Sequence, residues 1–263
     1  MIHIKTKQEI DLMREGGRIL AEIIKKLSDA VRPGITTKDI DKLAGELILF
    51  YEKENKGRVK TAFLGYGDYP AHVCTSVNDE VVHCVPSDRE LKEGEIISID
   101  AGIKYKGFYL DSAVTLPVLG DTGYENWAKF NPELHKLLEV TKESLNAGIK
   151  QAKAGNHIGD ISHATQTVIE RNRFGVIREL VGHGIGRQLH EEPQVPNFGS
   201  VGEGIKLQEG MVIAIEPMVS LGDWRLVKGA DSFTYKTKDG SHAAHFEHTV
   251  AITNGGPMVL TLL

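Results

Sequence analysis

The sequence predicts an α+β fold in which a helix pair followed by antiparallel strands occurs twice, with the two halves related by a pseudo-twofold axis. A repeated phrase points to this fold: residues 91–100 and 207–216 share one order of leucine, glutamate, glycine and aliphatic residues, and both end in an acid. A repeated helix start points the same way, because Gly34 to Asp39 and Gly155 to Asp160 span the same number of positions. One helix-and-strand unit is therefore used twice.

The composition is that of an ordinary soluble globular protein. Of 263 residues, 25% are charged and 41% hydrophobic, which is enough apolar sequence for a substantial core. The formal net charge of -5 gives no reason to expect stable nucleic-acid binding. Only two cysteines are present, Cys74 and Cys84, so no disulfide framework is predicted and a reducing cytosol is the expected home.

No targeting or membrane segment is expected. The N-terminus lacks the uninterrupted apolar core of a signal peptide, and no apolar run approaches the ~18 residues of a membrane span. We therefore expect a cytoplasmic protein without membrane contact. The composition is turn-like between Gly120 and Asn131, so the halves, roughly 1–120 and 131–263, are expected to join there within a single catalytic domain covering 1–263.

The first half opens with two predicted helices. Thr6 and Glu9 have the spacing of a capping box at the start of the first helix, and Pro33 marks its end. The second helix is expected to start near Thr36 or Thr37 and to run to about residue 51. The apolar face of the first helix consists of Ile10, Met13, Gly17, Leu20, Ile24, Leu27 and Val31.

The second half repeats the helix pair. Asn131 and Pro132 open one helix by cap and first-turn logic, and Gly155 stops it. Asp160 and Ile161 then open the next helix, as their counterparts do in the first half.

The stretch from Leu91 to Thr115 predicts a β-hairpin that carries two carboxylates against a core. A β-branched run ends at Asp100, a turn follows at 104–107, and the return strand contains Asp111. An isolated aspartate of this kind is better interpreted as an exposed strand-end residue. Burying an ionised carboxylate without a partner is costly and two close carboxylates repel, so a positive group should lie between these two.

The acids recur in the second half, which predicts a metal site. Glu216 closes the second phrase as Asp100 closes the first, and Glu247 begins a strand-like segment as Asp111 does. If the halves pack about a pseudo-twofold axis, all four acids converge. Four acids are tolerable in one place only with multivalent cations.

Imidazoles of the second half complete this predicted site. Glycines on both sides of His183 let the backbone approach closely and leave the ring accessible to a metal. No second histidine follows His190 at helical spacing, so the single-zinc peptidase helix is absent. One histidine among four acids suits two bridged divalent ions such as Mn(II), Fe(II) or Co(II), with Zn(II) also compatible.

A loop-rich stretch from Ala62 to Pro86 is a candidate pocket wall that holds Tyr66, Tyr69, Cys74 and His83. Taken alone, His83 is better interpreted as a surface or core histidine, and Cys74 as inert packing, because nothing beside the thiol would lower its pKa. Neither a Gly-x-Ser-x-Gly elbow nor a Walker loop occurs, so covalent acyl chemistry and nucleotide hydrolysis lack support.

Together these motifs are specific, and over essentially its whole length the chain resembles the type I methionine aminopeptidases of the pita-bread fold. The motifs that carry the resemblance are Asp100, Asp111, Gly182-His183-Gly184-Ile185-Gly186, His190-Glu191-Glu192-Pro193, Ile215-Glu216-Pro217-Met218 and Glu247-His248-Thr249.

The resemblance implies a metal-dependent aminopeptidase that removes the N-terminal methionine of nascent polypeptides. It implies two divalent metal ions, Co, Mn, Fe or Zn, held by five ligands: Asp100 on one ion, His183 and Glu216 on the other, and Asp111 and Glu247 bridging both. Activated water would attack the first peptide bond. By the same resemblance, Glu216 would move the proton, and a monomer with a transient ribosome contact is expected.

The resemblance also implies a substrate pocket. His83 and His190 would contact the substrate and stabilise the oxyanion, and the methionine pocket would be shaped by Cys74, Tyr66, Tyr69 and Trp224. Three departures from the family pattern affect selectivity rather than the metal site: Cys84 replaces the usual Gly, Leu189 a common aromatic, and Gly67 the His of some members.

Three alternatives remain open. Xaa-Pro aminopeptidases and prolidases share the fold and ligands, but they typically carry an extra N-terminal domain, and here the first helix begins at about residue 6. Type II methionine aminopeptidases carry a long insertion in the second half, whereas Glu216 and Glu247 lie little more than a strand pair apart. An inactive protein- or RNA-binding relative would be favoured by a lost ligand, and all five are present.

Overall fold

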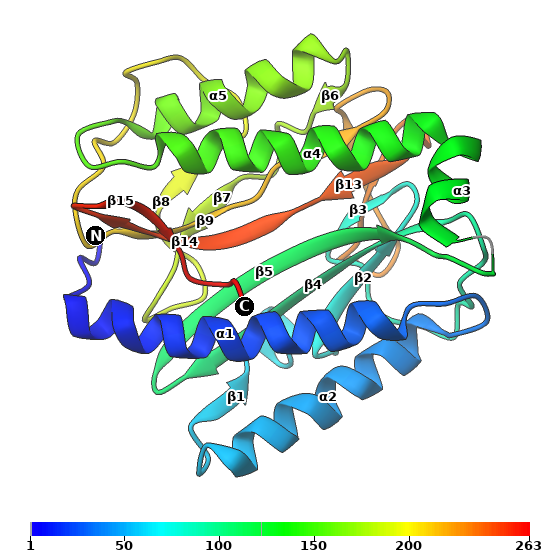
Figure 1. The fold of residues 1–263 in the computed structure, drawn as a ribbon, viewed down its shortest axis with the longest axis horizontal. Helices are drawn as coiled ribbons and strands as arrows, with labels where there is room; N and C mark the ends of the chain where they lie inside the picture. Colours follow the sequence, from blue (N-terminus) through cyan, green and yellow to red (C-terminus); the bar gives the residue numbers. More distant parts are fainter. Residues whose placement is uncertain (1, 122) are drawn as a thin grey trace.

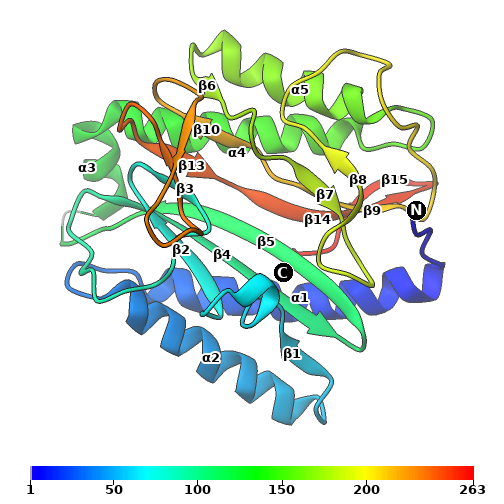
Figure 2. The ribbon, with the colours of Figure 1, turned by 180° about the vertical axis from the view of Figure 1, so that it is seen from behind.

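The computed structural model describes residues 2–121 and 123–263. A curved sheet lies between two helix pairs, one from each half of the chain (Figure 1). Seen from behind, the strands and several loops lie in front of the long helices, so the long helices cover one face of the sheet (Figure 2). The helices are α1 Lys7–Ala30, α2 Thr37–Glu54, α3 Gly123–Phe130, α4 Pro132–Gln151, α5 Ile158–Arg171 and the short 3-10 helix η1 Tyr66–Asp68.

The main sheet joins the two halves through the pairing of β5 with β14. Its order is β1-β4-β5-β14-β9-β7-β8, with β2 added on β4 and β15 on β14, and two three-stranded sheets, β13-β10-β6 and β11-β12-β3, flank it. The strands are β1 Val59–Thr61, β2 Val73–Val77, β3 Glu80–Val82, β4 Ile96–Tyr105, β5 Phe108–Pro117, β6 Gly175–Val176, β7 Gly182–Gly184, β8 Glu191–Val195, β9 Val212–Ile215, β10 Met218–Ser220, β11 Leu226–Lys228, β12 Tyr235–Thr237, β13 Ala243–His245, β14 Glu247–Thr253 and β15 Gly256–Val259.

The helix starts follow the predicted capping logic. The backbone N–H of Thr6 donates to Glu9 at 2.8 Å, which confirms the capping box of α1. In α2 and α5 the aspartates Asp39 and Asp160 stand at the third helical position, where each accepts the N–H of its cap residue. Helix α5 therefore begins at Ile158, ahead of the predicted start, but the equivalence of the two helix starts is confirmed.

Three predictions of local structure were wrong in detail. Helix α1 buries Ile23, which the predicted face omitted, fully and Ile24 only in part; the 3.6-residue period places both beside Leu20 and Leu27, so tertiary packing decides between them. Helix α2 continues to Glu54 instead of ending near residue 51. The predicted loop-rich stretch 62–86 contains β2 and β3, whose residues are all buried and so show no alternating pattern.

The segment between the halves forms helix α3 where turns were expected. Trp127 of α3 is buried in an apolar cluster with Ile96, Leu137 and Leu138. A segment of eight residues is too short to be a stable helix by itself, so this tertiary burial stabilises it despite its turn-like composition.

The hairpin of β4 and β5 is confirmed and longer than predicted. It pairs continuously from Ile96 with Pro117 to Tyr105 with Phe108, and β4 runs on beyond Asp100. Lys106 and Gly107 both have positive φ, the conformation of a tight two-residue hairpin turn.

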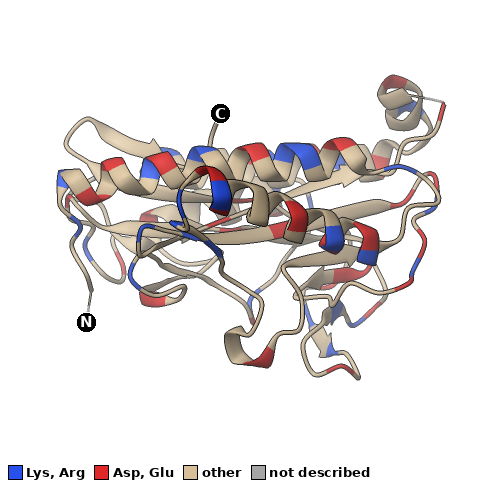
Figure 3. Cartoon of the chain, turned by 90° about the horizontal axis from the view of Figure 1, so that it is seen from below, with Lys and Arg blue, Asp and Glu red and all other residues tan. Residues whose placement is uncertain are grey.

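The largest apolar core draws on both halves of the chain. Met13 and Ile97 from the first half lie in one cluster with Val212 and Ala251 from the second. Basic and acidic residues alternate along the outward faces of the helices (Figure 3). No helix among residues 2–121 and 123–263 combines the length and the apolar character needed to cross a membrane.

Candidate active site

Three adjacent strands bring three of the predicted acids together. In the register of the sheet, Ala113 of β5 pairs with Asp100 of β4 on one side and with Glu247 of β14 on the other. Asp111 lies two residues before Ala113 on β5, and alternation along a strand turns both side chains to the same face. Glu216 follows β9 directly, beside the pairing of Ile215 with His248 on β14. The predicted convergence of four acids from two halves is therefore seen.

Buried oxygens of this cluster lack protein partners. Asp100, Asp111 and Glu247 are buried, and within the described residues each has one carboxylate oxygen without a hydrogen bond. Ligand atoms of Asp111, His183 and Glu247 all lie within 4.8 Å of one another. Buried polar atoms are normally paired, so these oxygens fit a site for a cation that the protein itself does not supply.

The electrostatics of the cluster agree with that fit. Burial raises the pKa of Asp100 to about 6, and it raises the pKa values of Asp111 and Glu247 well above the ordinary range, with repulsion from neighbouring carboxylates adding to the effect. Burial also pushes the pKa of Glu216 upward, but the neighbouring imidazoles of His245 and His183 outweigh it and hold this pKa below its usual value. Divalent cations would relieve the repulsion among the acids.

His183 is placed for ligation by its glycine neighbours. A Cβ on Gly182 would lie 2.4 Å from the carbonyl oxygen of Ala214, so only glycine lets β7 pack against β9 here. The Nδ1 atom of His183 lies 2.9 Å from the carbonyl oxygen of Gly184, and a proton on Nδ1 would leave the Nε2 lone pair free. Nε2 is 3.6 Å from Glu216 Oε1.

His245 is a fourth imidazole at the cluster that the sequence reasoning missed. Its side chain is buried, and Nε2 lies 3.5 Å from Glu216 Oε2 and 4.0 Å from Glu247 Oε2. Neither ring nitrogen has a hydrogen-bond partner within the described residues. The signal was present, because residues two apart on an extended chain share a face, and His245 stands two before Glu247.

Two threonine hydroxyls fasten β5 to the chain from His245, the end of β13, to Thr249 of β14, on either side of a short ladder. Between β5 and β14, two residue pairs are in strand register: Ala113 with Glu247 and Ser112 with His248. Thr249 Oγ1 accepts the N–H of Asp111 at 3.0 Å and donates to its carbonyl at 2.8 Å. Thr115 Oγ1 makes the equivalent pair of bonds to His245, at 2.8 and 2.7 Å. Side chains thus continue the ladder where the two strands separate.

An apolar cavity of about 250 Å³ opens onto the acid cluster. Of the predicted pocket residues, Tyr66, Tyr69, Cys74, His83 and His190 all line it. The sequence reasoning missed Phe63 and Phe233, which carry no motif, and gave Leu189 only as a departure from the family pattern. The remaining lining residues are Gly67, Leu189, Asp100, Asp111, His183, Glu216 and Glu247.

Trp224 lies elsewhere and is not among the described residues that line this cavity. Its ring lies against the guanidinium groups of Arg178 and Arg225, at 5.4 and 5.1 Å. It also packs on the apolar cluster that contains Val82 and Met218. Trp224 is thus partly buried against this cluster and stands apart from the cavity lining.

The sequence and the fold have counterparts among known proteins. The profile of Metallopeptidase family M24 matches residues 11–254. The chain belongs to metallopeptidase family M24. Methionine aminopeptidase from Clostridium perfringens is 45% identical over 263 residues, which cover 100% of both chains, and methionine aminopeptidase 1 from Bacillus subtilis is 45% identical over 261 residues, 99% of both.

Solved structures of M24 relatives confirm the predicted pita-bread fold. The crystal structure of methionine aminopeptidase from Thermotoga maritima superposes with a TM-score of 0.90 at 45% identity and covers 100% of both chains. Prolidase from Pyrococcus furiosus gives a TM-score of 0.74 at 20% identity, with 99% of this chain and 65% of that chain covered. At that identity the prolidase shows the shared fold alone.

Two further imidazoles of this M24 chain face the cavity as neutral rings. Burial lowers the pKa of His190 to about 4, and nearby His183 adds to the shift. Burial likewise lowers the pKa of His83. The Nδ1 atom of His190 lies 2.8 Å from the Tyr66 hydroxyl, which leaves Nε2 for a ligand. A wider cleft of about 530 Å³ continues outward from His83 and His190 past His3, Glu192 and Gln194.

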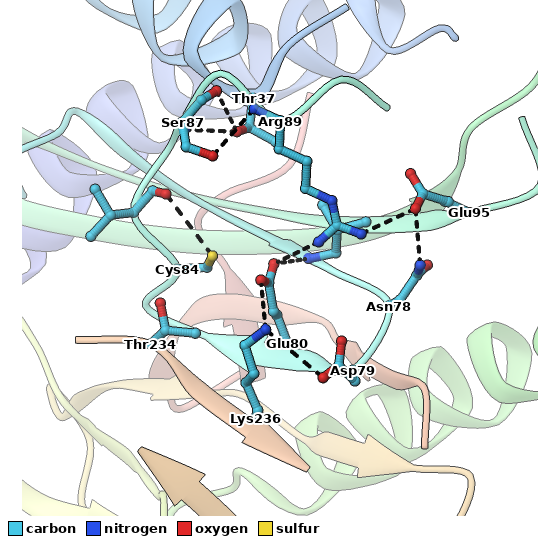
Figure 4. Close-up of polar contacts among 12 residues, drawn as sticks. Thr37, Asn78, Asp79, Glu80, Cys84, Ser87, Arg89, Glu95, Thr234 and Lys236 are labelled. Atoms are coloured by element: carbon cyan, nitrogen blue, oxygen red, sulfur yellow. Dashed lines mark hydrogen bonds and ion pairs between the residues drawn. The ribbon is translucent and has the colours of Figure 1, made fainter. Parts of the chain in front are cut away.

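A polar network supports the turn that delivers His83. Figure 4 shows Arg89 between two carboxylates, 3.0 Å from Glu95 and 3.4 Å from Glu80. Lys236 of β12 approaches Glu80 from the other side at 3.1 Å. Glu80 also accepts the backbone N–H of Val77 at 2.9 Å, which closes the turn between β2 and β3. Charge pairing therefore fixes the strand that ends next to His83.

Proposed function

We propose that this M24 metallopeptidase removes the N-terminal methionine of nascent polypeptides by hydrolysing the first peptide bond. The observation that carries the proposal is the apolar cavity of about 250 Å³ that ends on buried, unpartnered carboxylates. Such a cavity accepts one flexible apolar side chain and brings the adjoining amide to the acids. Full-length relatives at 45% identity are named methionine aminopeptidases, which supports the same reaction.

Five residues would hold two divalent metal ions, of Mn, Fe, Co or Zn. When bound, the ions would lower the pKa of a shared water and polarise the peptide carbonyl. The oxygen-rich donor set with one imidazole suits these ions. The ligands are Asp100 for one ion, His183 and Glu216 for the other, and Asp111 and Glu247 as bridges.

Glu216 is the proposed proton carrier. Its lowered pKa keeps the carboxylate ionised at neutral pH, ready to accept a proton from the attacking water and pass it to the leaving amine. His245, 3.5 Å from Oε2, limits the orientations open to this carboxylate.

His190 and His83 would stabilise the oxygen of the tetrahedral intermediate. Because the Tyr66 hydroxyl can donate to His190 Nδ1, the neutral ring can carry its proton on Nε2 and donate it to that oxygen. Neutral imidazoles donate hydrogen bonds without adding a fixed charge beside the metal ions.

The methionine side chain would lie against Cys74, Tyr69 and Phe63. Sulfur-aromatic contacts suit a thioether and contribute about 0.3 to 1.5 kcal/mol each. The thiol of Cys74 plays no chemical part in this proposal, because burial, with Asp100 close by, raises its pKa well above the ordinary value and keeps it protonated. Trp224 has no direct part in this proposal, because it is not among the described residues that line the cavity.

The alternatives have weaker support. Prolidase-like structures match the fold at 20% identity, against 45% for the methionine aminopeptidases named above. An inactive binding module would not need five ligand residues directed to one place. As a cytoplasmic monomer, the enzyme would act on chains emerging from the ribosome and would contact it transiently.

One assay tests the proposal. Purified protein, with and without added Mn(II) or Co(II), is given Met-Ala-Ser and, in parallel, Xaa-Pro peptides. We expect metal-dependent release of methionine from the first substrate and little release from the second. Preferred cleavage of Xaa-Pro would favour the prolidase reaction, and no cleavage of either at saturating metal would favour the binding module.

A further inference from the structure

A buried ion pair outside the cavity has no part in the chemistry proposed above. Lys5 Nζ lies 2.6 Å from Glu191 Oε2, and only 2% and 1% of the two side chains are exposed. Burial of two charges carries a desolvation cost that their attraction only partly offsets, so such a pair is weak support for stability. Its best-attested use is to fix one arrangement of the chain.

The arrangement that this pair fixes is the loop between β7 and β8. Glu191 Oε1 accepts the backbone N–H groups of Arg187 at 2.6 Å and Gln188 at 3.1 Å, while Oε2 receives Lys5. The Glu191 carboxylate therefore closes the loop through Oε1 and pairs with the Lys5 ammonium group through Oε2. The residue just before Glu191 is His190, which lines the cavity.

Lys5 cannot move aside without disturbing its surroundings. Its backbone N–H donates to the carbonyl of Gly210 at 2.7 Å, and the next residue, Thr6, caps helix α1. Its side chain runs beneath Gly186, where an added Cβ would come within 2.4 Å of Lys5 Cε. The ammonium group is thus delivered to Glu191 by the N-terminal segment in a single position.

The other contacts of His190 hold only its ring. The Tyr66 hydroxyl lies 2.8 Å from Nδ1, and the ring of His183 packs against it at 4.4 Å between centroids. Neither contact fixes the loop backbone. In the described part of the chain, Lys5 lines neither the apolar cavity nor the outer cleft, whereas Glu191 lines the outer cleft, so the direct polar link from Lys5 to the site is Glu191.

We propose that Lys5 is a positioning residue that, by pairing with Glu191, holds the 186–190 loop and so aims His190 into the cavity. This inference rests on the proposed function. Without the ammonium group, the Glu191 carboxylate would turn toward water and release the N–H groups of Arg187 and Gln188. The five proposed metal ligands lie outside the 186–190 loop and would stay in place.

A double-mutant cycle on Met-Ala-Ser hydrolysis tests the proposal. Lys5→Met and His190→Ala should each lower kcat by about 10- to 100-fold, the range for a lost transition-state donor. The double variant should be within about threefold of His190→Ala alone, because both changes remove the same contact. Multiplication of the two effects would overturn the proposal.

A second ion pair on the same loop, which is exposed, provides the matched control. Arg187 lies 2.6 Å from Glu9, with 60% and 19% of the side chains exposed. Arg187→Met removes this pair but keeps the backbone donor to Glu191, so kcat should stay within about threefold of wild type. If Arg187→Met lowered kcat as much as Lys5→Met does, any contact of the loop would have the same effect, and the proposal of a specific role for Lys5 would be wrong.

A readout without turnover separates this inference from the proposed function. Amide hydrogen exchange at Arg187 and Gln188 should lose protection in Lys5→Met, while Mn(II) affinity measured by calorimetry stays unchanged. Lys5→Met/Glu191→Gln should recover at least about tenfold in kcat over Lys5→Met, because a neutral amide oxygen still accepts both N–H groups. Unchanged exchange, or no recovery in a folded double variant, contradicts the proposal even if wild type releases methionine.

Discussion

The same ten-residue phrase folds differently in the two halves of the molecule. In the first half, β4 runs through Asp100 and returns at once as β5, with continuous pairing from Ile96 to Tyr105. In the second half, β9 ends at Ile215, and the chain returns only at Glu247 as β14, which pairs with β9 over four positions. Pro217 offers a reason, since proline has no N–H to continue a ladder.

The difference lies in how the chain runs between the two acids of each half. The uninterrupted hairpin of the first half fixes Asp100 and Asp111 on two central strands. The excursion between Glu216 and Glu247 builds β10 to β13 and brings Phe233 and His245 to the cavity and the acids. Both halves supply acids at equivalent positions, and both line the pocket: Phe63, Tyr66, Tyr69, Cys74 and His83 come from the first half, and Leu189, His190 and Phe233 from the second.

The largest effect is expected where the comparison demands equality, at the proposed bridging acids. Asp111→Asn should lower kcat on Met-Ala-Ser by about 1,000-fold or more, at the upper end for loss of one electrostatic group, and should weaken Mn(II) binding in calorimetry. Glu247→Gln, the matching change in the other half, should do the same. Circular dichroism should remain that of the wild type, and undiminished turnover of Asp111→Asn at saturating metal would refute its bridging role.

The second effect concerns the stability of the metal-free protein, which should depend on the charge of the buried Asp100. The pKa of Asp100 is raised to about 6 in the folded state, above the ~3.9 of an unfolded chain. The group therefore stabilises the folded state below about pH 4, and this contribution is lost as the pH rises through 6. Relative to wild type, Asp100→Asn should gain roughly 1 to 3 kcal/mol between pH 4.5 and 7.5.

Urea unfolding in EDTA at the two pH values measures that gain. Added Mn(II) should reverse the order of the two proteins at pH 7.5, because wild type alone keeps all its ligands. A stability difference that did not change with pH would mean that burial does not raise the pKa of Asp100 in the folded state.

Sequence reasoning reached the acids because identical spacing in two halves is a local signal. It did not show that the second phrase ends its strand at Ile215, because the two phrases match up to the closing acid and Pro217, in place of Ala101, lies just beyond them. The helix at Trp127 was missed because its stability comes from tertiary burial. Phe233 was missed because an isolated aromatic in a loop carries no period.

The smaller parts of the site depended on contacts between distant residues. His245 was recognisable only from its place two residues before an acid, and the ion pair of Lys5 with Glu191 spans 186 positions. The ligand set remains a prediction, because convergence of side chains does not measure metal binding. The sequence therefore predicts repeated local patterns well, but it does not predict which distant side chains contact each other in the fold.

A third prediction tests the threonine ties between the halves. Thr249→Val leaves the buried N–H of Asp111 unpaired and should cost about 1 to 3 kcal/mol of stability in urea unfolding. Because Thr249 holds a proposed ligand strand, Mn(II) affinity should also fall by about 10- to 100-fold. Thr115→Val is the matched control, since it ties His245 instead and should cost similar stability with a smaller loss of affinity. Equal losses of affinity would contradict this distinction.

The smallest effect is expected at Cys74, where the first half forms the pocket wall. Cys74 of β2 pairs with Asp100 of β4, and its buried thiol lines the cavity. Cys74→Ser keeps the size and the donor, so kcat/KM for Met-Ala-Ser should stay within about tenfold of wild type, in line with small shape changes in an apolar pocket. Cys74→Trp fills the cavity and should block methionine entry while Mn(II) still binds. If Cys74→Ser were as inactive as Asp111→Asn with metal bound, the thiol would have to take part in the chemistry, which its raised pKa argues against.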